Sequence, residues 1–339
     1  MRLIKTEDAV GHVLCHDMTQ IIKDKYKDAR FRKGHVVTEE DIPVLLSMGK
    51  EHLYVWEMTS GMVHENDAAE RLLALCGQEN MIRSGVKEGK IELKAACDGV
   101  FLVDSARLVA VNSQDEVMIA TRKGGMAVRE GDKLAGMRVI PLIIEEEKLR
   151  KAEQAAGDKP LLSLKPYVRK TACIVATGGE IKKGLIKDTF TPVVIDKLKT
   201  YGIETLEVVY SGDGVENVRD AVLTMREKKP DMILCTGGMS VDPDDNTPGG
   251  IKAAGANIIA YGAPVLPGAM FLLGYFDDGM PVMGLPGCVM YAGATVFDLV
   301  LPKIAADVPV TRADLAALGE GGLCLGCKPC HYPICPFGK

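Results

Sequence analysis

The sequence predicts an α/β protein, with a doubly wound, mostly parallel sheet preceded by a smaller β-rich or mixed N-terminal region. Beyond Tyr167, short apolar runs alternate with helix-like segments across short connections, which is the pattern of a parallel sheet covered by helices. Between Ile91 and Ile144, by contrast, the apolar runs are separated by glycines, as in small β domains and barrels. A length of 339 residues also exceeds that of one typical domain.

The N-terminal half divides into a small module and a β-rich domain. In the module, a helix is expected after Thr38 and a strand from His52 to Trp56. An amphipathic helix over 62–80 is expected to open the β-rich domain, whose short runs, ARLVAVN from Ala106 among them, we interpret as strands. The charged run EEEKLRKAEQAAGDKP is interpreted as a solvated helix or a linker. The expected division of the chain is 1–60 (mixed module), 61–150 (β-rich domain), 151–166 (linker), 167–310 (α/β domain) and 311–339 (cysteine-rich tail).

The α/β domain is expected to begin with a strand that ends at Thr177. Thr191-Pro192 suits the start of a helix, because threonine caps helices and proline fits the first turn. Two further strands, IETLEVVY and DMILCT, flank a helix that stops at Pro230. Ligands of such sheets bind at the carboxyl ends of the strands, so the loops after these strands are the first candidates for a site.

Composition argues against several classes of protein. The net charge is −5 and no long basic run is present, which disfavours nucleic acid or an anionic membrane as the partner. The N-terminus lacks the apolar core of a signal peptide, and the apolar stretch Met280–Leu301 is interrupted by Pro281 and Pro286. We therefore expect no membrane span and a cytoplasmic location, with Cys173 and Cys235 as reduced core residues.

Four glycine-containing loops follow the expected strands. They are Thr177-Gly178-Gly179-Glu180, Ser211-Gly212-Asp213-Gly214, Thr236-Gly237-Gly238-Met239-Ser240 and Gly284-Leu285-Pro286-Gly287. Bare glycine backbone can approach an anion closely, and the aspartates that follow the third loop suit a hard cation such as magnesium. The fourth loop is expected to lead straight into an apolar helix, whose N-terminus favours anions. Phosphate and magnesium are therefore the predicted ligands.

Residues 170–305 resemble the molybdopterin-binding domain shared by MoeA, MogA and the corresponding parts of gephyrin. The resemblance rests on ATGGEIKKGLIKDTF, GDGVENVRDAV, CTGGMSVDPDD, VLPGAMF and GLPGCVMYAG, which follow the family's motif order. A further segment, FRKGHVVTEEDIPVLLSMGKEHLYVWE, is similar to a MoeA element that stands directly before the binding domain in that family. In this chain the β-rich region lies between the two.

The resemblance implies a ligand, a metal and a set of site residues. The implied ligand is molybdopterin or adenylyl-molybdopterin, bound with Mg²⁺, and the implied reaction places molybdate on the dithiolene and releases AMP. Glu180, Asp213 and Asp245 are the implied catalytic residues, with Asp213 and Asp245 also holding the Mg²⁺. The implied cofactor-binding residues are Thr177, Gly178, Asp188, Thr236, Gly237, Gly238, Ser240, Pro286 and Gly287. Asp188 could equally cap a turn, and the resemblance further implies a homo-oligomer.

The sequence departs from the family pattern at four places. Gly179 stands where the family has aspartate, Asp242 where it has glycine, Ala269-Met270 where it has Lys-Pro, and Cys288-Val289 where it has Asn-Pro. These departures leave three alternatives to MoeA-like molybdate insertion. They are a non-catalytic molybdopterin carrier or sensor, a MogA-like adenylyltransferase, and a nucleotide-processing enzyme of the CinA type. The GLPG motif and the N-terminal segment weigh against the last.

The chain ends in a cysteine-rich tail, GGLCLGCKPCHYPICPFGK. Cys324, Cys327, Cys330 and Cys335 have the spacing C-x2-C-x2-C-x4-C, which is one residue longer than the bacterial ferredoxin pattern. We predict an iron–sulfur cluster or a zinc ion on these thiols, with His331 as a substitute ligand. The alternative is a redox-active or partner-docking tail, and the hypothesis is that it contacts a molybdenum enzyme or its maturation machinery.

Overall fold

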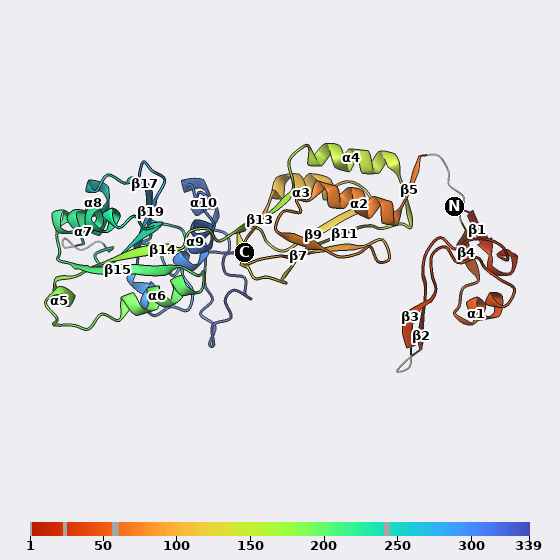
Figure 1. The fold of residues 1–339 in the computed structure, drawn as a ribbon, viewed down its shortest axis with the longest axis horizontal. Helices are drawn as coiled ribbons and strands as arrows, with labels where there is room; N and C mark the ends of the chain where they lie inside the picture. Colours follow the sequence, from red (N-terminus) through yellow and green to blue (C-terminus); the bar gives the residue numbers. More distant parts are fainter. Residues whose placement is uncertain (1, 23–25, 56–60, 241–244) are drawn as a thin grey trace. The chain divides into compact units, whose positions relative to one another are not determined.

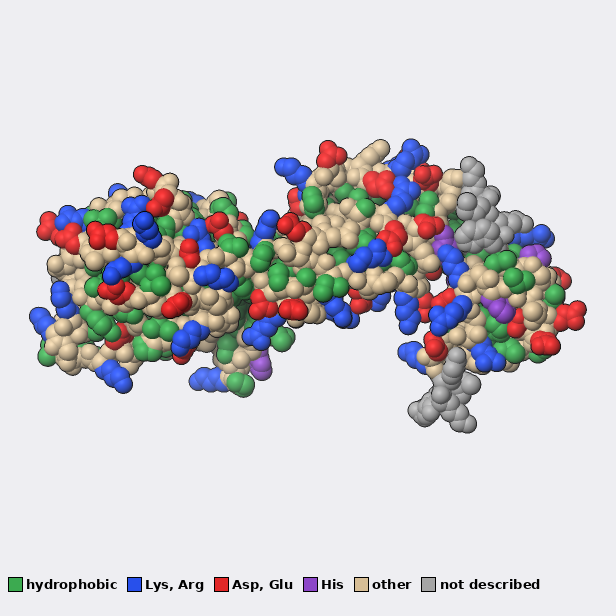
Figure 2. All heavy atoms as spheres, viewed as in Figure 1, with side chains coloured by type: hydrophobic (Ala, Val, Ile, Leu, Met, Phe, Trp, Pro, Cys, Tyr) green, Lys and Arg blue, Asp and Glu red, His purple; other side chains and the backbone are tan. Residues whose placement is uncertain are grey.

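The computed structural model describes residues 2–22, 26–55, 61–240 and 245–339. The chain forms two compact units (Figure 1). The first comprises Met1–Ala96, Val103–Gly124 and Glu130–Ser163, and the second comprises Cys97–Leu102, Gly125–Arg129 and Leu164–Lys339. On the face shown in Figure 2, lysine and arginine side chains are interspersed with aspartates and glutamates. Within the described part of the chain, the helices are too short or too polar to cross a membrane.

The N-terminal part of the first unit is a small mixed module. Its elements are β1 (Arg2–Lys5), η1 (Thr6–Asp8), β2 (Met18–Ile22), β3 (Tyr26–Phe31), α1 (Asp41–Ser47) and β4 (His52–Val55). β1 pairs antiparallel with β4, and β2 with β3. The predicted helix after Thr38 is confirmed, and the amide and hydroxyl of Thr38 each donate to Asp41 at 2.8 Å. The predicted strand is confirmed over β4, while Trp56 lies outside the described residues.

The rest of the first unit is a four-stranded antiparallel sheet covered by helices. Its elements are β5 (Met62–His64), α2 (Glu65–Leu75), β6 (Met81–Arg83), β7 (Ile91–Ala95), α3 (Ser105–Asn112), β9 (Val117–Thr121), β11 (Lys133–Val139), β12 (Ile143–Glu145) and α4 (Glu146–Ala156). The strand order is β6-β7-β11-β9, and β5 pairs separately with β12. Ile91, Leu93 and Ala95 alternate with more exposed residues, so one face of β7 is buried. Figure 1 shows α2, α3 and α4 on one side of this sheet.

Two predictions for this region need correction. The run from Ala106 is helix α3, and its predicted strand is wrong, because Asp104 caps the helix by accepting a bond from the amide of Arg107 at 3.1 Å. The helix expected over 62–80 is shorter, since residues 62–64 form strand β5 and α2 ends at Leu75. The charged run EEEKLRKAEQAAGDKP, which was expected to be a solvated helix or a linker, contains helix α4, in which Leu149 and Ala152 are buried.

The second unit is built on a six-stranded sheet. Its elements are β14 (Thr171–Thr177), α5 (Gly179–Lys182), α6 (Phe190–Lys199), β15 (Glu204–Ser211), α7 (Val215–Glu227), β16 (Met232–Thr236), α8 (Thr247–Ala253), β17 (Asn257–Tyr261), β18 (Leu272–Tyr275), β19 (Pro281–Leu285), η2 (Gly287–Met290), α9 (Val296–Ala305) and α10 (Arg312–Ala317). The strand order is β15-β14-β16-β19-β18-β17. The first four strands are mutually parallel, and β18 runs antiparallel to both of its neighbours. A separate three-stranded sheet joins β10 (Met126–Val128), β8 (Gly99–Val103) and β13 (Leu162–Pro166).

Helices cover both faces of the six-stranded sheet, which confirms the doubly wound α/β fold. Ala172 and Ile174 of β14 face a core shared with α6 and α9. Cys173 and Val175, which alternate with them, face a core shared with α7 and α8. Burial on both faces explains why these strands are continuously apolar. Cys173 and Cys235 are fully buried core residues as predicted, and burial raises the pKa of the Cys235 thiol to about 12.

Candidate functional site

The structure brings the four glycine loops to one edge of the six-stranded sheet. The last residues of the parallel strands are Thr177, Ser211, Thr236 and Leu285. Thr177 lies opposite Ser211, and Thr236 lies opposite Leu285. Neighbouring strands are about 4.8 Å apart, so the loops that leave these strands are adjacent. This edge is the candidate site.

Two threonine hydroxyls, those of Thr177 and Thr247, hold the third loop. The hydroxyl of Thr177 donates to the carbonyl of Thr236 at 2.9 Å and lies 3.1 Å from the hydroxyl of Thr247. Thr247 in turn donates its hydroxyl to the carbonyl of Gly237 at 2.8 Å and its amide to the carbonyl of Gly238 at 3.1 Å. The side chains of Thr177 and Thr247 therefore hold the backbone of the third loop at Gly237 and Gly238 in place. Thr247 was not among the site residues predicted from the sequence.

Both glycines of the third loop are required by the geometry. Gly237 and Gly238 have φ angles of +81° and +57°, a region that strongly favours glycine. A Cβ on Gly237 would lie 2.3 Å from the carbonyl oxygen of Thr177, and one on Gly238 would lie 2.7 Å from the hydroxyl of Thr247. The backbone of Gly237 and Gly238 is packed so closely that no side chain fits at either position. Loops that bind a phosphate group through backbone amides have the same property.

The first and second loops are joined by a carboxylate. The amide of Gly179 donates to Oδ2 of Asp213 at 3.1 Å, and Nδ2 of Asn217 donates to the carbonyl of Asp213 at 2.6 Å. A Cβ on Gly179 would lie 2.6 Å from Oδ2 of Asp213. The structure therefore explains one departure from the family pattern, because a side chain at position 179 would collide with the carboxylate of the second loop. Glu180 follows on α5 and is exposed.

Asp188 occupies the start of α6. Its Oδ1 accepts bonds from the amides of Phe190 and Thr191 at 2.9 and 3.0 Å, so the side chain caps the helix. Of the two interpretations of Asp188, the contacts that the structure shows are those of a cap. Burial raises the pKa of the nearby Tyr210 phenol, and the charge of Asp188 adds to this effect.

Asp245 lies at the end of the third loop and is half-buried. The hydroxyl of Tyr261, at the end of β17, donates to the carbonyls of Met239 and Ser240 at 3.0 and 3.2 Å. Burial raises the pKa of Tyr261, and the charge of Asp245 raises it further. The side chain of Ser240 is exposed, and Asp242 and Asp244 lie outside the described residues.

The fourth loop forms a wall, but not the predicted helix terminus. Pro286 is buried, and Gly287 has open space where a Cβ would point. The prediction that this loop leads straight into an apolar helix is wrong, because a single 3₁₀ turn, η2, follows and α9 begins only at Val296. Thr295 and Asp298 form a capping box that occupies amides at the start of α9. The expected anion attraction by this helix N-terminus is therefore not available at Gly287.

A lysine that our sequence reasoning did not single out approaches the second loop. The Nζ of Lys182, on α5, comes within 3.9 Å of the position that a Cβ on Gly212 would occupy. Ala269-Met270 stands where the resembled family has Lys-Pro, and Lys182 brings a positive charge to the second loop from α5. The sequence feature that could have identified Lys182 as a site residue is its position in EIKKGLIKD, just after the first glycine loop.

The predicted metal ligands are not gathered in the structure. Within residues 2–22, 26–55, 61–240 and 245–339, no three His, Cys, Asp or Glu side chains come together as a metal site. For magnesium this leaves Asp213 and Asp245 as separate carboxylates on two loops. The four tail cysteines are free thiols that line one pocket with His331, without converging on one point.

Comparisons with known proteins match two parts of the chain to family models. A family model described as a probable molybdopterin binding domain matches residues 173–306, and one described as a domain of unknown function matches residues 3–57. A CinA-like protein of Petrotoga mobilis is 32% identical over 76 residues, which are 22% of this chain and 19% of that protein. The chain thus matches about a fifth of the length of that relative.

Two solved structures are similar to this chain at lower sequence identity. The Mog protein from Mycobacterium ulcerans is 21% identical, with a TM-score of 0.35 over 42% of this chain and 95% of its own. A molybdenum cofactor biosynthesis protein from Pyrococcus furiosus is 13% identical, with a TM-score of 0.27 over 93% of this chain and 64% of its own. At these values the likeness does not extend to activity or ligand.

The fold and the site together define an α/β domain that presents glycine loops at the carboxyl edge of a parallel sheet. Within this domain, residues 173–306 are similar to the family of probable molybdopterin binding domains.

Proposed function

We propose that this protein binds molybdopterin, or adenylyl-molybdopterin, through its phosphate groups at the carboxyl edge of the six-stranded sheet, as a step of molybdenum cofactor biosynthesis. The observation that carries the proposal is the loop Gly237-Gly238, which the hydroxyls of Thr177 and Thr247 hold where no side chain fits. Such a bare backbone turn accepts an anion and excludes bulkier neighbours. The match of residues 173–306 to a probable molybdopterin binding domain supports a molybdopterin as the anion.

The other loops supply what a phosphorylated pterin needs around that turn. Lys182 adds a positive charge beside Gly212, and Pro286 with Gly287 forms an uncharged wall with open space in front of it. We propose that the phosphate lies over the third loop and that Thr177, Gly178 and Ser240 border it. The pterin body would then lie along the fourth loop.

Asp213 and Asp245 are the residues that fit Mg²⁺. Magnesium in such sites commonly takes one or two carboxylates and completes its shell with water and substrate phosphates, so separate carboxylates are compatible with it. Oδ2 of Asp213 already accepts the amide of Gly179, which fixes the orientation of that carboxylate. When bound, the ion would neutralise charge on the phosphates.

The finer proposal is MoeA-like turnover, in which adenylyl-molybdopterin loses AMP while molybdate is placed on the dithiolene. In this proposal Asp213, oriented by Gly179, and Asp245, beside Tyr261, would hold the Mg²⁺ that neutralises the phosphates of the substrate. Glu180 stays exposed next to the first loop, where it can accept a proton from a group on the substrate. The homo-oligomer implied by the family resemblance stays a prediction, which sedimentation of the full chain would test.

The test is to incubate the full chain with adenylyl-molybdopterin, Mg²⁺ and molybdate, and to measure both binding and released AMP. Gly238→Ala is expected to lose binding, because its Cβ would meet Thr247 at 2.7 Å. Gly85→Ala is the matched control, since a Cβ there has nothing within 4 Å. Binding with AMP release supports turnover, whereas equal binding by Gly238→Ala and wild type would overturn the proposed site.

A non-catalytic carrier is the second candidate. It is favoured by Ala269-Met270 and Cys288-Val289, which replace the Lys-Pro and Asn-Pro of the family. Tight binding without AMP release in the same experiment would establish this function. Because the CinA-like relative is 32% identical over part of the chain, a nucleotide diphosphate is the appropriate competing ligand. Its cleavage, with no binding of pterin, would refute both candidates.

A further inference from the structure

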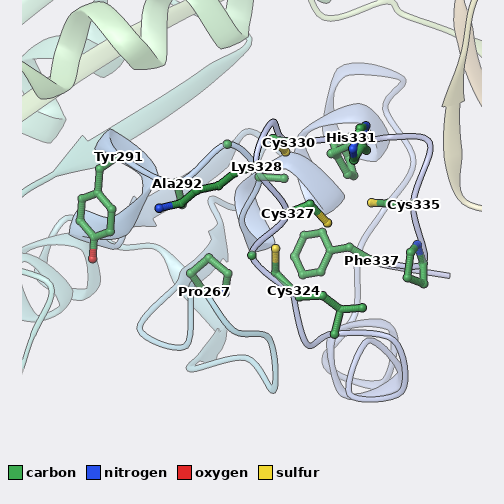
Figure 3. Close-up of a pocket in the computed structure, with 16 residues that line it drawn as sticks. Pro267, Tyr291, Ala292, Cys324, Cys327, Lys328, Cys330, His331, Cys335 and Phe337 are labelled. Carbon is green, nitrogen blue, oxygen red and sulfur yellow. The ribbon is translucent and has the colours of Figure 1, made fainter.

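The cysteine-rich tail forms a pocket whose lining contains every thiol of the tail. It encloses about 390 Å³ and includes Cys324, Cys327, Cys330, Cys335 and His331. Figure 3 shows these side chains together, with the ring of Phe337 among them between Cys324 and Cys335. None of the described residues that line it carries a carboxylate. The donors are therefore sulfur and imidazole, which suit zinc or iron and not magnesium or calcium.

The two ends of the tail are fixed to the second unit. At the first end, the amide of Cys324 donates to the carbonyl of Leu266 at 2.8 Å. At the second end, the hydroxyl of Tyr332 donates to the carbonyl of Asp298 at 3.0 Å, and Phe337 is buried in the core. Cys324 and Cys335 consequently pack against that core. The segment between the fixed ends carries the exposed Cys327 and Cys330.

One glycine of the neighbouring loop makes room for the tail. A Cβ on Gly293 would lie 2.8 Å from both Cβ and Sγ of Cys330. Any side chain at position 293 would thus push Cys330 out of the pocket. Cys330 of the tail therefore packs against the loop between η2 and α9, which contains Gly293. Cys330 is nevertheless exposed to solvent.

The pocket lies at the same edge of the sheet as the pterin loops. Tyr291, which lines it, directly follows η2, and η2 begins at Gly287 of the fourth loop. A 3₁₀ turn of this length spans roughly 8 Å at about 2 Å per residue. Pro267, on the other side of the pocket, belongs to the loop between β17 and β18, which leaves the edge at Tyr261. Tyr261 itself contacts the third loop at Ser240.

We propose that the tail pocket is a thiolate site for iron or zinc beside the pterin loops, with Cys324, Cys327, Cys330 and Cys335 as ligands. The thiols do not converge in the metal-free chain, so the segment between the fixed ends closes when the metal binds. Each coordinating thiol loses its proton to solvent, and no electron is transferred. The half-buried Cys324 and Cys335 form the fixed side of the site, and the exposed Cys327 and Cys330 form the side that moves.

The experiment has two measurements on the full-length protein, purified without oxygen. Iron, zinc and acid-labile sulfide are quantified first: iron with sulfide indicates a cluster, and zinc alone indicates a single ion. The metal is then removed and the protein is titrated with Co²⁺, whose thiolate complexes absorb strongly in the near ultraviolet. We expect saturation at one Co²⁺ per chain.

Three variants test which side chains bind. Cys327→Ser and Cys330→Ser are expected to weaken Co²⁺ binding by more than about tenfold, since even indirect ligand partners commonly contribute that much. Both positions are exposed, so the fold is expected to survive. Gly293→Ala keeps all four thiols and is also expected to weaken binding, because its Cβ displaces Cys330. Cys97→Ser, outside the pocket, is the control and is expected to bind Co²⁺ like wild type.

Two results would overturn the proposal. One is a protein that is purified without metal and gives no thiolate absorption at saturating Co²⁺. The other is a band that persists unchanged in the variant that combines Cys327→Ser with Cys330→Ser. Neither measurement uses a pterin, so a failure here is separate from a failure of the proposed function.

Discussion

The amide of Gly179 donates a hydrogen bond to the carboxylate of Asp213 across 3.1 Å, and this contact joins the first and second loops of the site. A Cβ on Gly179 would lie only 2.6 Å from the same oxygen. The observed position of the Asp213 carboxylate therefore requires glycine at position 179. The carboxylate that contacts the backbone of Gly179 in the first loop is that of Asp213, which reaches it from the second loop.

Gly179→Ala is expected to weaken pterin binding by roughly tenfold, which corresponds to about 1.4 kcal/mol. The added methyl group displaces the carboxylate of Asp213 and separates the two loops. Isothermal titration with molybdopterin measures the effect. Gly85→Ala, where a Cβ meets nothing within 4 Å, should match wild type. An unchanged affinity in Gly179→Ala would mean that the contact does not shape the site.

Asp213→Asn separates the charge of this side chain from its hydrogen bond. The amide oxygen of asparagine can still accept the amide of Gly179, but the negative charge is lost. We expect adenylyl-molybdopterin to bind without Mg²⁺ as it does to wild type, while the gain in affinity on adding Mg²⁺ falls. Titrations with and without Mg²⁺ measure both quantities. A full magnesium effect in the variant would remove Asp213 from the set of proposed ligands.

Thr247→Val is expected to lower the free energy of unfolding by about 1–2 kcal/mol. Valine keeps the shape of threonine but leaves the carbonyl of Gly237 without the hydroxyl donor at 2.8 Å. Urea denaturation measures the change, with Thr200→Val as the control, because the Thr200 hydroxyl bonds to Asp196 on an exposed surface. If the two variants lose equal stability, the buried hydroxyl of Thr247 has no special role.

Asp231 makes stability depend on pH. Burial opposes ionisation of this carboxyl, but the amide of Lys170 and the amide and hydroxyl of Thr171 donate to Oδ2 at 2.7–2.9 Å and hold its pKa below the ordinary value of 3.8. Its contribution is therefore complete above the unfolded-state pKa and is lost as pH falls through the lower folded-state pKa. The free energy of unfolding of wild type should fall more steeply below pH 4 than that of Asp231→Asn. Parallel pH profiles would contradict this assignment.

Metal in the tail pocket is expected to change pterin affinity, because Tyr291 of the pocket and Gly287 of the pterin wall are joined by η2 alone. Thermodynamic linkage requires that pterin change metal affinity by the same factor. Titrating the metal-loaded and the metal-free protein with molybdopterin measures the factor. Equal affinities would show that the two sites act independently.

The sequence predicted those parts of the fold that depend on local patterns. Buried strands ending at Thr177 and Thr236 are read from continuous apolar runs, and a parallel sheet then requires their loops to share an edge. The helix expected after Gly287 failed, because the capping box of Thr295 and Asp298 starts α9 later. The apolar run from Ala106 was predicted to be a strand, but it forms helix α3, which begins with an N-cap at Asp104.

The residues that were missed act through contacts between distant parts of the chain. The hydroxyl of Thr247 meets that of Thr177, 70 positions away in the sequence. Lys182 reaches Gly212 from a different loop. The reason for glycine at position 179 also appears only when Asp213 is placed beside it. Such contacts leave no periodic signal in a single sequence.

A crystal structure of the full chain with adenylyl-molybdopterin and Mg²⁺ bound tests the central claim most directly. We expect the phosphates to lie against the backbone of Gly237 and Gly238, within hydrogen-bond distance of the third loop. The side chain of Lys182 should be turned toward them. Phosphates bound elsewhere, with this loop unoccupied, would contradict it.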